Sequence, residues 1–194
     1  MNADAEVVAR RRQNRVRVGG RVNYAVDRGE ESESNTNLHA KYDHFLTRRW
    51  YAYANTTLEH DRFKDLRLRT TLGVGSGYQV LELPRTNFAL EAGLEHVSSD
   101  YYATPDEEFP AARLASRFDH WLKENVVQLF QISEGYMNLE NAERSFVRTQ
   151  TGLRFPLTTG FVGQLQLNVD WEGDPQPGRD STDETAILSL GYQW

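Results

Sequence analysis

The sequence predicts an all-β protein, an antiparallel up-and-down transmembrane β-barrel of about ten strands. The first observation is a hydrophobic period of two, which from Val16 onward separates an apolar face from a polar face. The second is segment length: most alternating segments run to about the 9–11 residues that a tilted strand needs to cross a bilayer. The third is that long polar connections alternate with short ones, as in outer-membrane barrels.

Ten segments carry the alternation, and the ninth is the clearest, with Leu165 and Leu167 set against Gln166 and Asn168. The predicted strands are 15–27, 37–45, 49–59, 66–80, 87–98, 113–122, 126–134, 145–155, 161–171 and 185–194. In 113–122 and 126–134 the apolar residues do not keep to one face, so we expect a bulge or register shift there. All six prolines fall between the predicted strands, where a missing N–H costs no ladder hydrogen bond.

The connections differ in length by position. The polar and mostly long ones are 28–36, 60–65, 99–112, 135–144 and 172–184, and the short ones lie near 46–48, 81–86, 123–125 and 156–160. Tight turns lie on the periplasmic side of outer-membrane barrels, and an even strand count returns both chain ends to that side. We therefore expect an N-terminal periplasmic tail at 1–14 and an outer-membrane barrel at 15–194.

The composition excludes several other classes of protein. The chain has 194 residues, of which 39% are hydrophobic, and no stretch approaches the roughly 20 apolar residues of a spanning helix. It contains no cysteine, which removes disulfide frameworks, cysteine–zinc sites and thiol catalysis. The net charge of -6 argues against nucleic acid as a partner. We expect no cofactor and no metal site.

Periodicity alone does not say which face of the strands points inward. Full charges in register on the polar faces, and aromatic residues near strand ends, favour apolar residues facing lipid and charges facing a lumen. The predicted lumen charge network is Arg17, Arg21, Lys41, Glu59, Arg67, Arg69, Glu91, Glu95, Arg117, Asp119, Arg148, Arg154 and Asp170. At the end of the sequence, Tyr192 and Trp194 resemble the terminal strand signal that the barrel insertion machinery reads.

Three stretches also resemble a known family. Gly-Val-Gly-Ser-Gly-Tyr-Gln at 73–79, Leu-Glu-Ala-Gly-Leu-Glu at 90–95 and Leu-Ser-Leu-Gly-Tyr-Gln-Trp at 188–194 are similar to the YdiY-like family of salt-induced outer-membrane proteins. The resemblance covers roughly residues 15–194. It implies a β-barrel in a Gram-negative envelope, with a domain of unknown function and no catalytic residues to carry over. Such proteins carry a secretory signal, and the start of this chain has no apolar core, so we interpret it as a mature or trimmed form.

The long connections are acidic, with sixteen acidic and five basic residues. An acidic rim binds divalent cations and, through them, the phosphates of lipopolysaccharide, or it biases a pore toward cations; a solvated surface is the simpler interpretation. Gly73, Gly75 and Gly77 sit within a strand with no helix after them, which excludes a dinucleotide loop. In a barrel they give room to facing side chains, for which we expect Arg67 and Arg69.

We therefore predict a non-enzymatic outer-membrane protein, either structural or a narrow conduit for ions or small solutes, with a charged and largely plugged lumen. Its expected partners are outer-membrane lipid, lipopolysaccharide and the barrel insertion machinery, and we expect a monomer. Two alternatives remain. A hydrolase at the extracellular rim needs His60 or His96 to face a serine or carboxylate, and a soluble ligand-binding β-barrel needs its charges outside and an apolar cavity inside.

Overall fold

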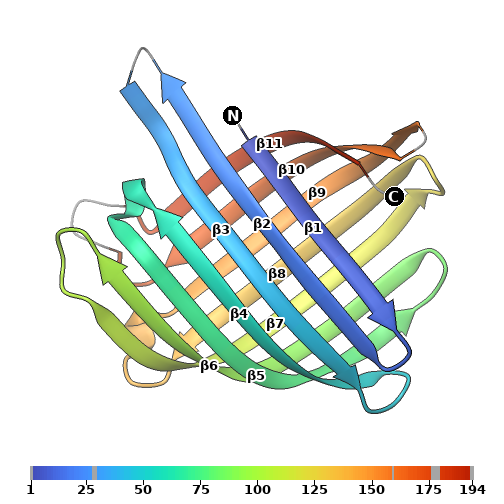
Figure 1. Ribbon diagram of the computed structural model, residues 1–194, viewed down its shortest axis with the longest axis horizontal. Helices are drawn as coiled ribbons and strands as arrows, with labels where there is room; N and C mark the ends of the chain where they lie inside the picture. The colour runs from blue at the N-terminus through green and yellow to red at the C-terminus, as the bar shows by residue number, and fades with distance from the viewer. Residues whose placement is uncertain (1, 28–29, 159, 176–179, 193–194) are drawn as a thin grey trace.

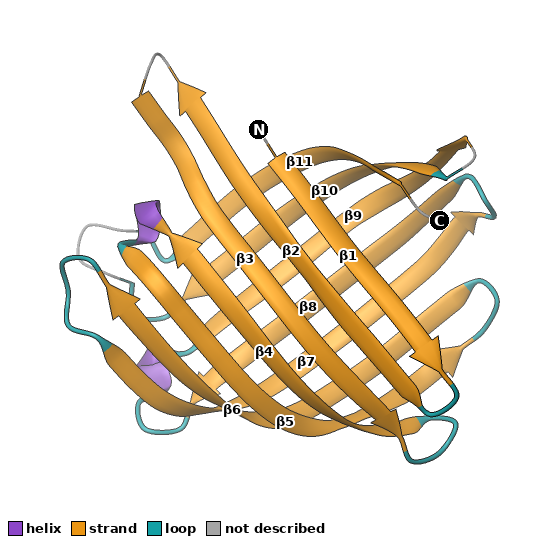
Figure 2. Ribbon diagram, viewed as in Figure 1, coloured by secondary structure: helices purple, strands orange, loops and turns teal. Residues whose placement is uncertain are grey.

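The described residues form one antiparallel sheet of eleven strands, and each strand pairs with its neighbours in the chain. The computed structural model describes residues 2–27, 30–158, 160–175 and 180–192. The sheet curls round into a barrel (Figures 1 and 2), which confirms the predicted up-and-down barrel. The strands are β1 (Asn2–Arg11), β2 (Asn14–Asp27), β3 (Glu30–Phe45), β4 (Trp50–Asp61), β5 (Leu66–Glu82), β6 (Thr86–Tyr101), β7 (Glu107–Lys123), β8 (Val127–Asn138), β9 (Phe146–Thr158), β10 (Phe161–Glu172) and β11 (Thr182–Tyr192). Two 3-10 turns, η1 (Arg62–Lys64) and η2 (Ala142–Arg144), follow β4 and β8.

Strand β1 lies where the sequence predicted an N-terminal tail, so the prediction of a tail at residues 1–14 is wrong. β1 pairs with β2 in a register that sets Val7 beside Val18. Two residues connect the strands, and Arg12 has a φ of 51°, a left-handed conformation more usual for glycine or asparagine. The turn therefore has no sequence signal. With eleven antiparallel strands, β1 and β11 run in the same direction. β1 therefore begins at the end of the barrel where β4 connects to β5 and β8 to β9, which we call the loop end. β11 finishes at the opposite end, where short turns join β3 to β4 and β5 to β6, which we call the turn end.

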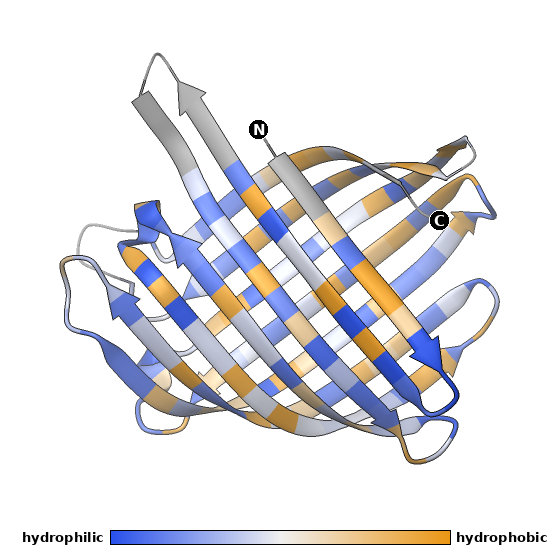
Figure 3. Ribbon diagram, viewed as in Figure 1, coloured by the Kyte–Doolittle hydropathy of each residue, from blue (hydrophilic) through white to orange (hydrophobic). Residues whose placement is uncertain are grey.

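The outer face of the barrel is apolar and its inner face is charged. Leu188 is 78% exposed, Leu114 68% and Val74 63%, whereas Asp43 is 0% and Glu95 3% exposed. Figure 3 shows apolar and polar residues alternating along the strands. The alternative of a soluble ligand-binding barrel needs the opposite arrangement, with charges outside and an apolar cavity inside. The period of two therefore separates an outer surface from a lumen.

The predicted alternation of long and short connections holds only in part, because the strands are longer than predicted and β3 begins at Glu30, inside the predicted long connection 28–36. Short turns join β3 to β4, β5 to β6 and β7 to β8. At the opposite end of the barrel, β7 begins at Glu107, which lies inside the predicted connection 99–112. The strand is longer than predicted because its pairing with β6 continues where its outward-facing residues become polar. The predicted irregularity in 113–134 is confirmed by a register shift between Trp121 and Lys123.

Among the prolines that the structure describes, two lie inside strands, which corrects the prediction that all of them lie between strands. Pro110 is the fourth residue of β7 and Pro156 the third from the end of β9. Both positions are close to a strand end, and Pro156 adjoins a register shift at Phe161/Val162. A proline has no N–H to donate, and near a strand end this costs the sheet few backbone hydrogen bonds.

Glycines of β5 make room for tyrosine rings of β4 that lie inside the barrel. Tyr51 pairs with Gly77 and Tyr53 with Gly75. A Cβ atom at Gly77 would lie 2.2 Å from Cζ of Tyr51, and one at Gly75 2.6 Å from Cζ of Tyr53. The space was predicted to hold arginine side chains, whereas the structure places aromatic rings there. Each glycine therefore permits a close cross-strand contact that any larger residue would block.

Two apolar clusters fill parts of the barrel interior. One lies toward the turn end and comprises Phe45, Tyr51 and Tyr53. The other lies toward the loop end and comprises Val97, Phe109, Ala111, Tyr136 and Phe146. Among the described residues, none of the helical segments has the length and apolar character to cross a membrane.

Candidate functional site

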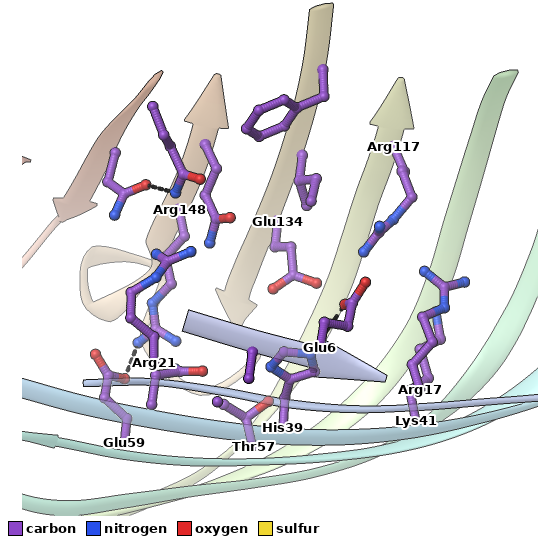
Figure 4. Close-up of a pocket in the computed structure, with 18 of the residues that line it drawn as sticks. Glu6, Arg17, Arg21, His39, Lys41, Thr57, Glu59, Arg117, Glu134 and Arg148 are labelled. Atoms are coloured by element: carbon purple, nitrogen blue, oxygen red, sulfur yellow. Dashed lines mark hydrogen bonds and ion pairs between the residues drawn. The ribbon is translucent and has the colours of Figure 1, made fainter. Parts of the chain in front are cut away.

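The lumen holds a cavity with a volume of about 1050 Å³. Residues from the first to the last strand line it, and Figure 4 shows ten of them with labels. The lining includes eight basic residues (Arg17, Arg21, Lys41, Lys64, Arg113, Arg117, Arg148 and Arg154) and seven acidic residues (Glu6, Glu59, Asp61, Glu91, Glu134, Asp170 and Asp183). The lumen is therefore polar and nearly balanced in charge, although the whole chain carries -6.

Arg113 on β7 is the centre of one cluster of charges. Its Nη1 donates to Glu91 Oε2 and to the Tyr53 hydroxyl, both at 3.0 Å, and its Nη2 pairs with Glu134. Its Nε lies 3.8 Å from Glu95. One buried guanidinium thus holds three carboxylates from two neighbouring strands, because planar forked donors match carboxylates well.

A second group surrounds Asp43 on β3, which is completely buried. Arg15 Nε lies 2.6 Å from its carboxylate, Arg17 Nη2 3.2 Å and Lys41 Nζ 3.6 Å. Lys41 also pairs with Glu91, which links this group to Arg113. Three cations around one carboxylate leave positive charge in excess at this side of the lumen.

At the loop end, ion pairs cross the lumen from β4 and β5 to β9 and β10. Glu59 pairs with Arg148, and Arg69 Nη1 lies 3.2 Å from Glu172 Oε1. These partners are 89 and 103 residues apart in the sequence. The ion pairs narrow the lumen at this end, because each brings side chains from opposite walls together.

Lys64 of η1 adds a further cross-lumen contact. Its Nζ lies 3.2 Å from Asp170 of β10 and 3.6 Å from Asp183 of β11. Burial alone lowers the pKa of Lys64, but the carboxylates of Asp170 and Glu59 outweigh it, so this pKa lies above its ordinary value. The ammonium group is therefore held in its charged form.

The wall formed by β9 and β10 is rich in amides rather than charges. Gln164 Nε2 donates to Gln166 Oε1 at 2.7 Å, and Gln166 donates in turn to Asn168. Arg154 closes this row by donating to Gln164 at 3.0 Å and pairing with Asp119 at 3.2 Å. The row offers neutral donors and acceptors to whatever occupies the cavity.

The structure brings most of the sequence-predicted lumen residues together, with one clear exception. Arg67 is exposed and pairs with Asp100 at 3.3 Å, because a register shift between Leu66 and Leu68 turns its side chain away from the lumen. Arg17, Lys41, Glu59, Arg69, Glu91, Glu95, Asp119, Arg148, Arg154 and Asp170 make the contacts above, and Arg21 and Arg117 also line the cavity.

Several lumen residues were missed by sequence reasoning. Glu6 lies in β1, where the sequence predicts a tail, and Lys64 and Glu172 lie in predicted connections. Glu134 ends a segment whose alternation is irregular. Of the predicted insertion signal, Tyr192 ends β11 with its backbone paired to Phe161, and Trp194 lies outside the described residues.

His60 and His96 do not face the serine or carboxylate that the hydrolase alternative needs. His60 Nδ1 lies 2.9 Å from the carbonyl oxygen of Arg67, and its ring packs edge-on against Tyr102 with centroids 6.2 Å apart. His96 is exposed on the outer face, in the row of Leu94. Neither histidine contacts a serine or carboxylate, and no group of metal-ligating side chains occurs among the described residues.

Comparisons with known proteins agree with the barrel architecture. The profile of a family described as "Protein of unknown function, DUF481" matches residues 1–194. The uncharacterized protein YdiY of Escherichia coli (strain K12) is 25% identical over 143 residues, 73% of this chain and 55% of YdiY, so the chain spans about half the length of this relative. These findings confirm the resemblance read from the sequence.

A solved structure supports the fold independently of sequence. The NanC porin in its rhombohedral crystal form superimposes with a TM-score of 0.65 over 100% of this chain and 93% of the porin, at 8% identity. At so low an identity the match concerns the fold alone, and the fold is that of a porin-like barrel.

Proposed function

The chain belongs to the DUF481 family of proteins of unknown function, and we propose that it is a non-enzymatic outer-membrane β-barrel that gives ions and small polar solutes a narrow path. The observation that carries this proposal is the combination of an apolar exterior with a polar cavity of about 1050 Å³ inside. An apolar exterior of this kind requires lipid around it, and a polar interior requires water.

The outer surface supports a membrane location. Exposed leucines and valines cover the middle of the strands, as at Leu94, Leu165 and Leu167. Toward the turn end, Trp50 packs against Tyr78 with ring centroids 4.8 Å apart. Aromatic residues of this kind form the interfacial girdles of outer-membrane barrels. Lipid and lipopolysaccharide are the partners that this location implies.

The lumen supports a restricted path rather than an open pore. Eleven strands enclose far less space than the 16–18 strands of general porins. The cross-lumen ion pairs Glu59–Arg148 and Arg69–Glu172 narrow the loop end further. Charges of both signs line the cavity, so polar solutes and hydrated ions fit it better than apolar ones.

Planar-bilayer recordings of the purified protein test this proposal. We expect discrete current steps with a unitary conductance below that of general porins. A faster-migrating band in unboiled than in boiled samples serves as the control for a folded barrel. Folded protein that inserts without current steps would reject the conduit, and protein that stays monodisperse without detergent would reject the membrane location.

A further inference from the structure

Arg17 of β2 has donor capacity that the protein leaves unused. It is 7% exposed and lines the cavity, and its Nη2 donates to Asp43 at 3.2 Å. Its buried Nε has no hydrogen-bond partner among the described residues. A guanidinium has five donors, and leaving a buried donor unpaired is unfavourable. A ligand that accepts from this group therefore gains stability.

Arg117 of β7 faces the same part of the cavity. Within the described part of the chain, no residue forms a hydrogen bond or an ion pair with it. Arg17 repels its charge, and Glu6, Asp119 and Glu91 attract it from a longer range. Figure 4 shows the guanidinium groups of Arg17 and Arg117 pointing toward each other, with Glu6 beside them. Two like charges facing one another without an anion between them repel. The space between them favours an anion.

The nearby carboxylates do not complete this pair of cations. Asp43 is already surrounded by cations of β2 and β3, and Asp119 pairs with Arg154 at 3.2 Å. Glu6 Oε2 lies 3.4 Å from His39 Nε2 and makes no hydrogen bond to either arginine. A ligand from outside therefore meets two cations whose charge the protein has only partly neutralised.

We propose that Arg17 and Arg117 bind the carboxylate of a small hydroxylated organic acid within the lumen. Arginine forks recognise carboxylates through paired hydrogen bonds. A cavity of about 1050 Å³ admits such a molecule, since small-molecule sites typically measure about 300–1,000 Å³. Gln150, Gln164 and Gln166 line the same cavity and supply donors and acceptors for hydroxyl groups. This inference deepens the proposed function by naming the class of solute, and it rests on that function for transport.

Isothermal titration calorimetry of the full chain in detergent micelles, with sodium glucuronate as the probe, tests the site. We expect saturable binding of glucuronate and none of glucose, which lacks the carboxylate. Arg117→Gln removes a charged donor without breaking any ion pair, so it should leave the barrel folded. Loss of a charge-assisted hydrogen bond worth about 1.5–3 kcal/mol weakens binding about tenfold or more.

Two further variants separate a site from a general effect of lumen charge. Arg148→Gln removes a lumen cation that pairs with Glu59 and should leave the affinity within about threefold of wild type. Glu6→Gln removes the carboxylate beside the arginines and should tighten binding. Absence of glucuronate binding to wild type, an unchanged affinity in Arg117→Gln, or an equal loss in Arg148→Gln would overturn the proposal.

The outcomes also distinguish this proposal from the proposed function. Binding without current steps in bilayers would reject the conduit and leave the anion site standing. Current steps without glucuronate binding would reject the anion site and leave the conduit standing.

Discussion

The ion pair between Arg69 and Glu172 should contribute far more to stability than an ion pair of the same chemistry two residues away. Arg69 Nη1 lies 3.2 Å from Glu172, with side chains 8% and 28% exposed. Arg67 lies 3.3 Å from Asp100, but these side chains are 56% and 39% exposed. Both pairs start from β5, so they differ mainly in facing the lumen or the outside.

The expected magnitude follows from burial. Two unit charges at 3.2 Å attract by about 5 kcal/mol at an effective dielectric constant of about 20, before desolvation is subtracted. Close, buried charge pairs give measured coupling energies from about 1.5 kcal/mol upward, and exposed pairs give about 0–1 kcal/mol. We therefore expect a coupling of about 1.5–3 kcal/mol for Arg69 with Glu172 and below about 1 kcal/mol for Arg67 with Asp100.

A double-mutant cycle measures these couplings. Arg69→Met, Glu172→Gln and the double variant are unfolded by urea in detergent micelles and followed by tryptophan fluorescence, and Arg67→Met with Asp100→Asn forms the matched cycle. The single lumen variants should also raise unitary conductance, because the bridge between β5 and β10 is lost. Couplings of the two pairs that agree within about 0.5 kcal/mol would refute the inward orientation of Arg69.

Two other perturbations test particular contacts. Gly77→Ala forces a Cβ atom to within 2.2 Å of the Tyr51 ring and should destabilise the barrel by about 1–3 kcal/mol. The control Gly135→Ala, whose Cβ has no atom nearer than 3.8 Å, should change the stability by less than about 0.5 kcal/mol. Midpoints of urea unfolding compare the two variants, and equal effects would contradict the packing. Because Asp170 and neighbouring carboxylates raise the pKa of Lys64 above its ordinary 10.5 despite burial, the stability that Lys64 contributes is fully present below that pH and lost as pH rises through the higher, folded value. The stability difference between wild type and Lys64→Met should therefore shrink in urea titrations above pH 10.5, and a difference that grows there would contradict the pairing.

The alternation of apolar and polar residues could be predicted from the sequence because it depends only on residues that follow one another along a strand. In β10, Leu165 and Leu167 point outward, whereas Gln166 lies inside, as the period of two requires. The same pattern does not reveal a bulge. Arg67 shares the parity of Arg69 in the sequence, and only the register shift beside Leu66 separates the two side chains.

The contacts across the lumen depend on information that a single sequence does not carry. Glu59 meets Arg148 because of the diameter of the barrel and the stagger of its strands, which join residues 89 positions apart. Strand β1 was missed because its turn contains Arg12 in place of the usual glycine or asparagine. Because β1 was not predicted, the position of Glu6 in the lumen and its closeness to Arg117 could not be predicted either.

The central claim, that the polar face is the inside and the apolar face meets lipid, is tested most directly by cysteine scanning of β10. The chain contains no cysteine, so single cysteines at 164–168 carry spin labels at known positions. In lipid vesicles, we expect labels at Leu165 and Leu167 to collide with oxygen dissolved in the bilayer, and labels at Gln164 and Asn168 to collide with a water-soluble nickel chelate. The opposite pattern, or one without a period of two, would contradict the claim.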